Sequence, residues 1–248
     1  MRALILASGR GSRLGDLTAK QPKCFTRVAG KRLVDWQRQA LNQAGIQQIA
    51  VTTGYYSDSF AELFSQRFHN ANWASSNMVS SMMMAEDYLS EQDTIISYSD
   101  IIYSSDAVSR LLKNQDDIAI AYDPNWLSQW QARYDNPLDD AESFAAENHY
   151  LTDIGRRVSH LNEINGQYMG LIKLSAKGWL QITAYLAELS PEQQAKLDMT
   201  TLLQALIQRG NKIATVAIND EWFEVDTLQD LAVAKQQVAQ CSWIKCDD

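Results

Sequence analysis

The sequence has few of the features from which disulfide-linked, zinc-binding and membrane-spanning proteins are built. Its three cysteines, Cys24, Cys241 and Cys246, form no CxxC pair and no cluster with histidine, so neither a disulfide framework nor a zinc site is indicated. The first apolar run, residues 3–7, is shorter than a signal-peptide core and far shorter than the roughly 20 residues of a membrane span. We therefore expect a soluble, cytoplasmic protein with free thiols and no membrane contact.

Positive charge is also scarce. The chain carries 22 Lys and Arg against 30 Asp and Glu, a net charge of −8, which argues against a nucleic-acid partner because surfaces that bind nucleic acid are usually basic. The exception is the first 38 residues, which hold nine Lys and Arg and only two acidic residues. A positive segment on an acidic body suits a small polyanion bound at one place, and the alternative is an ordinary solvated basic face.

Short apolar runs alternate with amphipathic segments along the 248 residues. The runs predict strands, and apolar residues at helical spacing predict helices between them. In the first half we expect strands at 2–7, 46–53, 94–98 and 117–122, and helices at 32–44, 57–68, 78–89 and 107–112. This repeated order predicts a Rossmann-like α/β fold, a mostly parallel twisted sheet with helices on both faces, in a single domain of residues 1–248.

The regular alternation breaks down between residues 124 and 154. This stretch has a run of acidic residues and no clear period, and we interpret it as an inserted hairpin or lid. Its Trp126 and Trp130 are either packing residues, the more common role, or part of an aromatic cage for a quaternary ammonium group. Beyond it we expect strands at 167–174, 212–218 and 222–225, and helices after Ser175, at 198–209 and at 228–239.

A glycine-rich loop, Ser8-Gly9-Arg10-Gly11-Ser12-Arg13, follows the first expected strand. Open α/β sheets bind ligands at the carboxyl ends of their strands, and glycine lets backbone N–H groups approach phosphate oxygens. The loop has Leu14 where the dinucleotide fingerprint has its third glycine, and it lacks the Gly-Lys-Ser/Thr of a P-loop. Dinucleotide binding and P-loop hydrolysis are therefore both disfavoured.

The residues after the loop give it a more specific meaning. Arg13-Leu14, Thr18, Pro22-Lys23 and Val28-x-Gly30-Lys31 occur in that order, ahead of a helix that carries Gln37. This string resembles the nucleotidyltransferase superfamily of sugar-phosphate nucleotidylyltransferases and bacterial choline-phosphate cytidylyltransferases. The resemblance implies that the loop wraps a nucleoside triphosphate and that Arg13 and Lys23 are catalytic cations on its phosphates. The nucleotide-binding residues that it implies in the loop are Leu6, Ala7, Ser8, Gly9, Gly11 and Ser12.

The same resemblance implies a magnesium site. Asp100 follows the expected strand 94–98, and Asp226 ends the string Trp222-Phe223-Glu224-Val225-Asp226 ahead of the last helix, much as in the cytidylyltransferase-like branch. Two carboxylates together with phosphate oxygens and water suit octahedral Mg²⁺. From the residues alone two other roles stay open, a helix cap for Asp226 and an ordinary loop carboxylate for Asp100.

Candidate contacts for the base and the acceptor lie further along the chain. Asn77 and Ser80 lie in a stretch that resembles part of the choline-phosphate cytidylyltransferase site, although a helix start with methionine packing explains most of it. Tyr55, just after the second expected strand, is a candidate to flank the base. Glu163 and Tyr168 are candidates to bind a cationic acceptor, through a carboxylate and a ring face.

Together with the resemblance, these residues predict an enzyme that transfers CMP from CTP to a small phosphorylated or phosphonylated acceptor and releases pyrophosphate. Phosphocholine, 2-aminoethylphosphonate and phosphoglutamine stay open as acceptors, and the product suits the decoration of cell-surface glycans or lipids. The alternatives are a sugar-1-phosphate nucleotidylyltransferase using UTP, dTTP or GTP, and a non-catalytic nucleotide-sugar sensor. A homodimer through the last helix or Trp243 is compatible with the sequence, which does not decide it.

Overall fold

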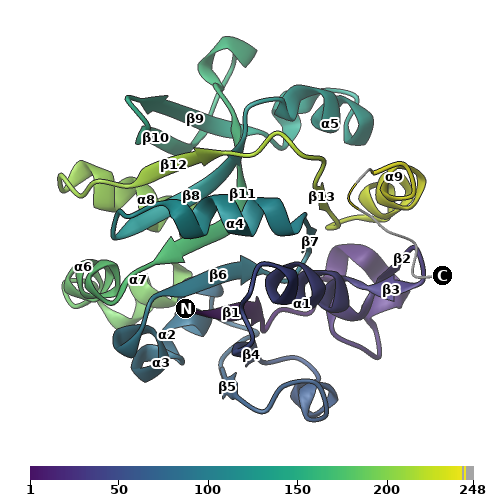
Figure 1. The fold of residues 1–248 in the computed structure, drawn as a ribbon, viewed down its shortest axis with the longest axis horizontal. Helices are drawn as coiled ribbons and strands as arrows, with labels where there is room; N and C mark the ends of the chain where they lie inside the picture. The colour runs from purple at the N-terminus through teal and green to yellow at the C-terminus, as the bar shows by residue number, and fades with distance from the viewer. Residues whose placement is uncertain (242, 244–248) are drawn as a thin grey trace.

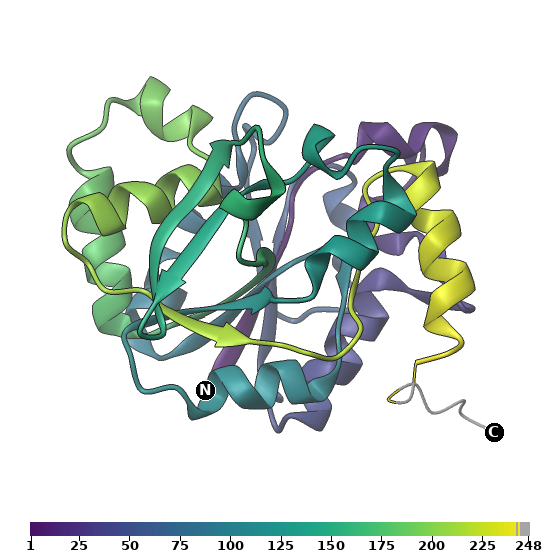
Figure 2. The ribbon, with the colours of Figure 1, turned by 90° about the horizontal axis from the view of Figure 1, so that it is seen from above.

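One nine-stranded sheet organises the chain in the computed structural model, which describes residues 1–241 and 243 (Figure 1, Figure 2). Its strand order is β5-β4-β1-β6-β11-β8-β12-β10-β9. In chain order these strands are β1 (Arg2–Ala7), β4 (Ile49–Thr53), β5 (Arg67–His69), β6 (Thr94–Tyr98), β8 (Ile118–Asp123), β9 (Glu142–Glu147), β10 (Tyr150–Arg157), β11 (Gln167–Leu174) and β12 (Ala214–Ala217). Only β10 and β11 run against the others, which confirms the predicted mostly parallel sheet.

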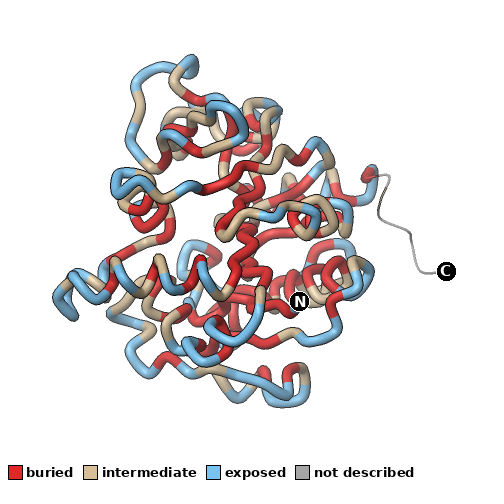
Figure 3. The backbone as a smooth tube through the Cα atoms, turned by 60° about the vertical axis from the view of Figure 1, so that its left-hand side comes forward, coloured by how far each residue is buried: buried red, intermediate tan, exposed pale blue. Residues whose placement is uncertain are grey.

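The central strand β1 shows why the apolar runs become buried strands. Side chains alternate between the two faces of a strand, so Ala3, Ile5 and Ala7 join one apolar core and Leu4 and Leu6 the other. All six residues of β1 are buried, and Figure 3 shows the buried backbone concentrated in the middle of the molecule. A strand covered on both faces is stabilised by a continuous apolar sequence, which is why residues 3–7 lack the alternation of a half-exposed strand.

Helices cover both faces of the sheet, as predicted (Figure 2). One core includes residues of α1 (Leu33–Gln43), α4 (Ser105–Lys113), α5 (Trp126–Arg133) and α9 (Leu228–Val238). The other includes residues of α2 (Met78–Met83), α3 (Glu86–Glu91), α6 (Ala176–Leu186) and α8 (Met199–Gln208), with α7 (Pro191–Lys196) beside α2. Within the described residues, no helix combines the length and the apolar composition needed to cross a membrane.

One helix prediction was wrong, and a second is confirmed except for a break. Residues 57–68 form a short 3-10 helix, Ser57–Phe60, and the strand β5. The apolar spacing was misleading because Phe60 and Phe64 pack in one core, whereas Phe68 belongs to the other and packs against Tyr88. The expected helix 78–89 is divided into α2 and α3 by Ala85, whose backbone leaves helical geometry.

The segment 124–154 is divided between a helix and an edge hairpin. Its first part is α5, followed by a short 3-10 helix, Pro137–Asp139. Its second part is β9 and the start of β10, which pair antiparallel at the edge of the sheet. Trp126 and Trp130 are 4% and 3% exposed and belong to the apolar core, so packing is confirmed for them and an aromatic cage is wrong.

The cysteines that the structure describes are free thiols, as predicted. Cys24 and Cys241 are free and buried, and Cys246 lies outside the described residues. Burial raises the pKa of Cys24 well above its ordinary value and that of Cys241 to about 11. A thiol in such surroundings stays protonated near neutral pH and is a poor nucleophile.

The two-sided core makes a stability prediction about two leucines on neighbouring helices. Leu202 of α8 is fully buried, and Leu180 of α6 is 63% exposed. We expect Leu202→Ala to lower the free energy of unfolding by about 2–5 kcal/mol, because it removes buried methyl groups and leaves a cavity. Leu180→Ala should change it by less than about 0.5 kcal/mol. Urea unfolding followed by circular dichroism measures both, and equal losses for the two variants would contradict the assignment of the α8 face to the core.

Candidate active site

The glycine loop leaves β1 at the carboxyl end of the sheet and turns against Lys23. Gly11 has a φ of +69°, and a Cβ atom at this position would lie 2.7 Å from the Lys23 side chain. The Thr18 hydroxyl donates to the carbonyl of Gly11 at 3.0 Å and fixes the turn. Only glycine at position 11 therefore allows the stem of Lys23 to pack across the loop.

Gly54 is a second glycine at which neighbouring atoms lie too close for a Cβ atom. A Cβ atom on Gly54, just after β4, would lie 2.5 Å from the Cβ of Trp73 and 2.6 Å from the carbonyl oxygen of Ser8. The next residue, Tyr55, donates its backbone N–H to the same carbonyl at 3.0 Å. Trp73 is thereby held beside the start of the glycine loop.

Asp100 and Asp226 meet through a small two-stranded sheet. The strand β7 (Ile101–Ile102) follows Asp100 and pairs antiparallel with β13 (Phe223–Glu224), which precedes Asp226. The backbone N–H of Val225 also donates to the carbonyl of Asp100 at 2.9 Å. These contacts bring together two carboxylates that lie far apart in the sequence.

The buried amide of Gln37 on α1 fixes the turn that carries Asp100. Its Nε2 atom donates to the carbonyl oxygens of Tyr98 at 3.0 Å and of Ile101 at 2.8 Å. Because these carbonyls stand on either side of Asp100 in the chain, one side chain holds both ends of the turn. The helix that begins after the glycine loop thus positions a carboxylate of the site.

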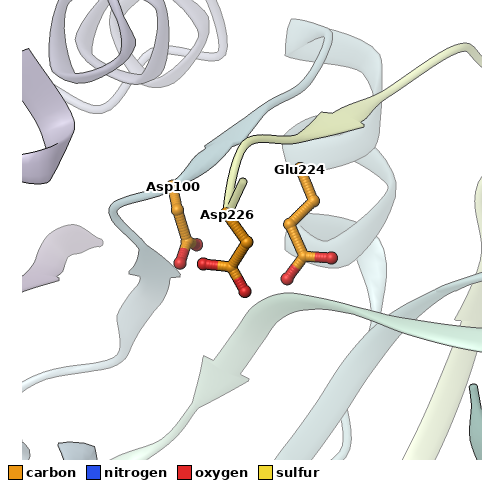
Figure 4. A group of neighbouring side chains, drawn as sticks. All are labelled: Asp100, Glu224 and Asp226. Carbon is orange, nitrogen blue, oxygen red and sulfur yellow. The ribbon is translucent and has the colours of Figure 1, made fainter. Parts of the chain in front are cut away.

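A third carboxylate, Glu224, completes the acidic cluster (Figure 4). One oxygen each of Asp100, Glu224 and Asp226 lie within 4.8 Å of one another. Burial raises the pKa of Glu224, and the guanidinium of Arg133 opposes that shift. The Oδ1 atom of Asp100 is buried and has no hydrogen-bond partner among the described residues. Three hard oxygen donors and an unpartnered carboxylate oxygen fit a divalent cation such as Mg²⁺.

Two cations contact these carboxylates from the glycine-loop side. The Nζ atom of Lys23 lies 2.7 Å from Oδ2 of Asp100 and also pairs with Asp226. Arg13 pairs with the other oxygen of Asp226. The side chain of Lys23 is only 10% exposed, whereas that of Arg13 is 61% exposed, so the lysine is fixed in the site and the arginine lies at its rim.

These groups line one cleft of about 380 Å³. The predicted site residues that line it are Leu6, Ser8, Gly9, Gly11, Ser12, Arg13, Lys23, Asn77, Asp100 and Asp226. Further lining residues that the sequence did not single out are Trp73, Ser76, Met78, Ser81, Tyr98, Ser99 and Glu224. The structure thus brings the residues predicted to bind the phosphates and the metal into one cleft. The cleft also has an uncharged surface around Trp73.

Three predicted nucleotide-binding residues, Ala7, Tyr55 and Ser80, do not line this cleft. The Tyr55 hydroxyl donates to the carbonyl of Ala19 at 2.8 Å, and its ring contacts Trp73. Ser80 donates to the carbonyl of Gln194 at 3.2 Å. Ala7 is buried in the core behind the loop. Direct nucleotide contact by these three residues remains a prediction.

The two acceptor-side predictions also lie away from the cleft lining. Glu163 accepts from the backbone N–H groups of Ser159 and His160 and caps the short helix Leu161–Glu163. Tyr168 packs edge to face against Tyr98, with ring centroids 5.7 Å apart. Tyr98, and not Tyr168, is the ring that lines the cleft. An acceptor role for Glu163 and Tyr168 remains a prediction.

One of the missed residues had a signal in the sequence. Glu224 stands two positions before Asp226, and residues at that spacing in extended chain lie on the same side. Trp73 had no such signal, because nothing local indicates that it packs against Gly54. Ser81 lines the cleft and the predicted Ser80 does not, because the rotation of α2 decides which serine faces the cleft.

Comparison with known proteins agrees with this site. The sequence profile of the MobA-like NTP transferase domain matches residues 3–167. A CTP:phosphoglutamine cytidylyltransferase of Campylobacter jejuni is 36% identical over 94% of this chain and 98% of its own length. A 2-aminoethylphosphonate cytidylyltransferase of Lancefieldella rimae is 30% identical over 43% of this chain and 45% of its own.

A solved structure supports the same fold. The inositol-1-phosphate CTP transferase of T. maritima superposes with a TM-score of 0.78 at 18% identity, covering 99% of this chain and 98% of that one. At this identity the likeness concerns the fold alone. The profile match, which spans more than half of the chain, and the relative of nearly equal length show the family. This chain belongs to the MobA-like NTP transferase family of nucleotidyltransferases.

Proposed function

We propose that this chain transfers CMP from CTP to a small phosphorylated or phosphonylated acceptor and releases pyrophosphate. The observation that carries the proposal is the meeting of Lys23 and Arg13 with Asp100 and Asp226 in one cleft beside the glycine loop. Fixed cations and metal-binding carboxylates next to flexible backbone are what nucleotidyl transfer requires. CTP is favoured because the relatives described above are cytidylyltransferases.

The reaction needs positioning more than it needs a nucleophilic side chain. An oxygen of the acceptor's phosphate or phosphonate attacks the α-phosphorus of CTP in line, the bond to the β-phosphate oxygen breaks, and pyrophosphate leaves with the bonding electrons. The attacking oxygen is already anionic near neutral pH, so no general base is required. This agrees with the described cleft lining, which contains no histidine.

The cations and the carboxylates of the cleft have different roles. Lys23 and Arg13 balance the negative charge that the phosphates bring to the site, and their hydrogen bonds hold the triphosphate in place. Asp100 and Asp226, with Glu224 beside them, would hold Mg²⁺, which supplies further positive charge on the phosphate oxygens. Lys23 pairs with both aspartates, so its ammonium would add positive charge where the phosphates bind.

For the acceptor we infer a phosphorylated amide of the phosphoglutamine type. The relative that is 36% identical over 94% of this chain is named for this substrate. The uncharged surface of the cleft around Trp73, with Ser76, Asn77 and Ser81, offers hydrogen bonds that suit an amide. We further propose that the reaction takes place in the cytoplasm, where CTP is made, and that the product carries the group onward to a glycan or lipid.

Substrate choice is testable by pyrophosphate release. We expect CTP with phosphoglutamine to give the highest kcat/KM among CTP, UTP, ATP, GTP and dTTP combined with phosphoglutamine, 2-aminoethylphosphonate, phosphocholine or glucose 1-phosphate. The 4-amino group of cytosine donates where uracil accepts, so the advantage of CTP over UTP should be on the order of 10²-fold or more. Faster turnover of UTP or dTTP with glucose 1-phosphate would favour a sugar-1-phosphate nucleotidylyltransferase instead.

The role of Lys23 makes a second prediction for the same assay. Lys23→Met keeps the apolar stem that packs on Gly11 and removes the ammonium group. We expect kcat/KM for pyrophosphate release to fall by about 10²–10³-fold, the usual loss when one charge-stabilising donor is removed. Lys20→Ala, which changes an exposed lysine of the same segment, is the matched control and should retain the parental value. Parental turnover in Lys23→Met would refute the assigned role.

A further inference from the structure

We infer that Arg133 is a positioning residue of the metal centre, fixing Glu224 by its side chain and Asp226 through Asp230. The inference rests on the proposed function, because it assigns a support to the carboxylates that would hold the ion. It also gives α5, the first part of the segment 124–154, a role that its sequence did not suggest. Figure 1 and Figure 2 show α5 beside α9, next to the strand that carries Glu224.

The first contact joins α5 directly to the acidic cluster. The Nη2 atom of Arg133 lies 2.9 Å from Oε2 of Glu224. The arginine side chain is 2% exposed and that of Glu224 is 23% exposed, so the pair is largely shielded from water. One carboxylate oxygen of Glu224 is thereby fixed, and this carboxylate lies in one cluster with those of Asp100 and Asp226.

The second contact runs through a carboxylate that is fully buried. The Nε atom of Arg133 donates to Oδ1 of Asp230 at 2.7 Å, and the side chain of Asp230 is 0% exposed. The Oδ2 atom of Asp230 accepts from the backbone N–H of Asp226 at 3.1 Å and of Thr227 at 2.8 Å. The arginine thus orients the carboxylate that holds the backbone of Asp226 at the start of α9.

Arginine is the side chain that these two contacts require. Its planar fork presents several N–H donors in fixed directions, so one guanidinium can bridge two carboxylates, whereas lysine offers a single point charge. The guanidinium also lies over the rings of Trp130 and Tyr134, at 4.9 and 5.1 Å from their centroids. Packing on both rings fixes its position before any ligand binds.

The charges explain why such a support is needed. Three carboxylates with oxygens within 4.8 Å of one another repel each other. Among the residues that the structure describes, Lys23 and Arg13 form their ion pairs with Asp100 and Asp226 and not with Glu224. Arg133 supplies a balancing charge for Glu224 through its own ion pair. Groups that orient metal ligands in this way typically contribute about 10–100-fold to metal affinity.

Binding of Mn²⁺ alone to the full chain, followed by the electron paramagnetic resonance signal of the free ion, tests the inference without a nucleotide. We expect Arg133→Lys to raise the Mn²⁺ dissociation constant by about 10-fold or more, because lysine cannot hold Glu224 and Asp230 together. Glu224→Gln, which keeps the side-chain volume, should raise it to a similar extent. The double variant should lose less Mn²⁺ affinity than the product of the two single losses. The reason is that each change already breaks the same contact between Arg133 and Glu224.

The matched control is Arg156→Lys on β10. Arg156 is half-exposed and forms a local ion pair with Asp153, so we expect parental Mn²⁺ affinity. All measurements are made well below the melting temperature of each variant, which separates metal binding from stability. A folded Arg133→Lys with parental Mn²⁺ affinity and a lowered melting temperature would show a purely structural role and overturn the inference.

Two further outcomes are decisive whatever happens to Arg133→Lys. Parental Mn²⁺ affinity in Glu224→Gln would show that Glu224 is not a metal ligand, so Arg133 would have no ligand to position. Circular dichroism checks that this variant is folded. Absence of Mn²⁺ binding by the parental chain would overturn the metal centre itself. Neither result depends on CTP turnover, so a failure of the inference is distinguishable from a failure of the proposed function.

Discussion

The contact of one lysine with two aspartates is the interaction on which the arrangement of this site depends. Lys23 comes from the segment after the glycine loop, Asp100 from the end of a sheet strand, and Asp226 from the approach to the last helix. Carboxylates this close together repel one another unless a cation lies between them. The ammonium of Lys23 meets that condition, and its stem lies against Gly11, so the glycine loop and the acidic cluster form a single unit.

The sheet explains how these distant segments meet. Parallel strands carry their carboxyl ends to the same edge, and loops at that edge converge whatever their separation in the chain. β1 ends in the glycine loop and pairs with β6, which ends just before Asp100. The side pairing of β7 with β13 then brings the chain before Asp226 to the same edge. Each element of the site is therefore placed by backbone pairing that does not depend on the chemistry of the cleft.

Two buried side chains hold the backbone of the acidic cluster in place. Gln37 holds the turn around Asp100 through two backbone carbonyls, and Asp230 holds the backbone of Asp226. Both supports are buried, where a hydrogen bond is not weakened by competition from water. Catalysis by positioning requires such fixed ligands, because a charged group that moves with each encounter stabilises the transition state less.

The sequence by itself determined the alternating elements, the two-sided sheet and the glycine loop, which depend on local spacing or on a contiguous motif. Lys23, Arg13, Asp100 and Asp226 were candidates through the resemblance to nucleotidyltransferases, and their spacing along the chain did not indicate that they meet. Spacing alone could not say that Phe68 belongs to a strand on the other face from Phe60, because a helix and two separate contacts give the same apolar pattern. The same limit applies to Trp73 and Ser81, which line the cleft, and to the contact of Arg133 with Glu224.

Only the tertiary structure decided these cases. Trp73 enters the cleft because Gly54 leaves room for it. Ser81 faces the cleft, and not Ser80, because successive side chains of a helix point about 100° apart and packing chooses the rotation. Arg133 reaches Glu224 across 91 positions because α5 packs beside α9. Such contacts depend on the free energy of packing the whole sheet and its helices, which no local pattern contains.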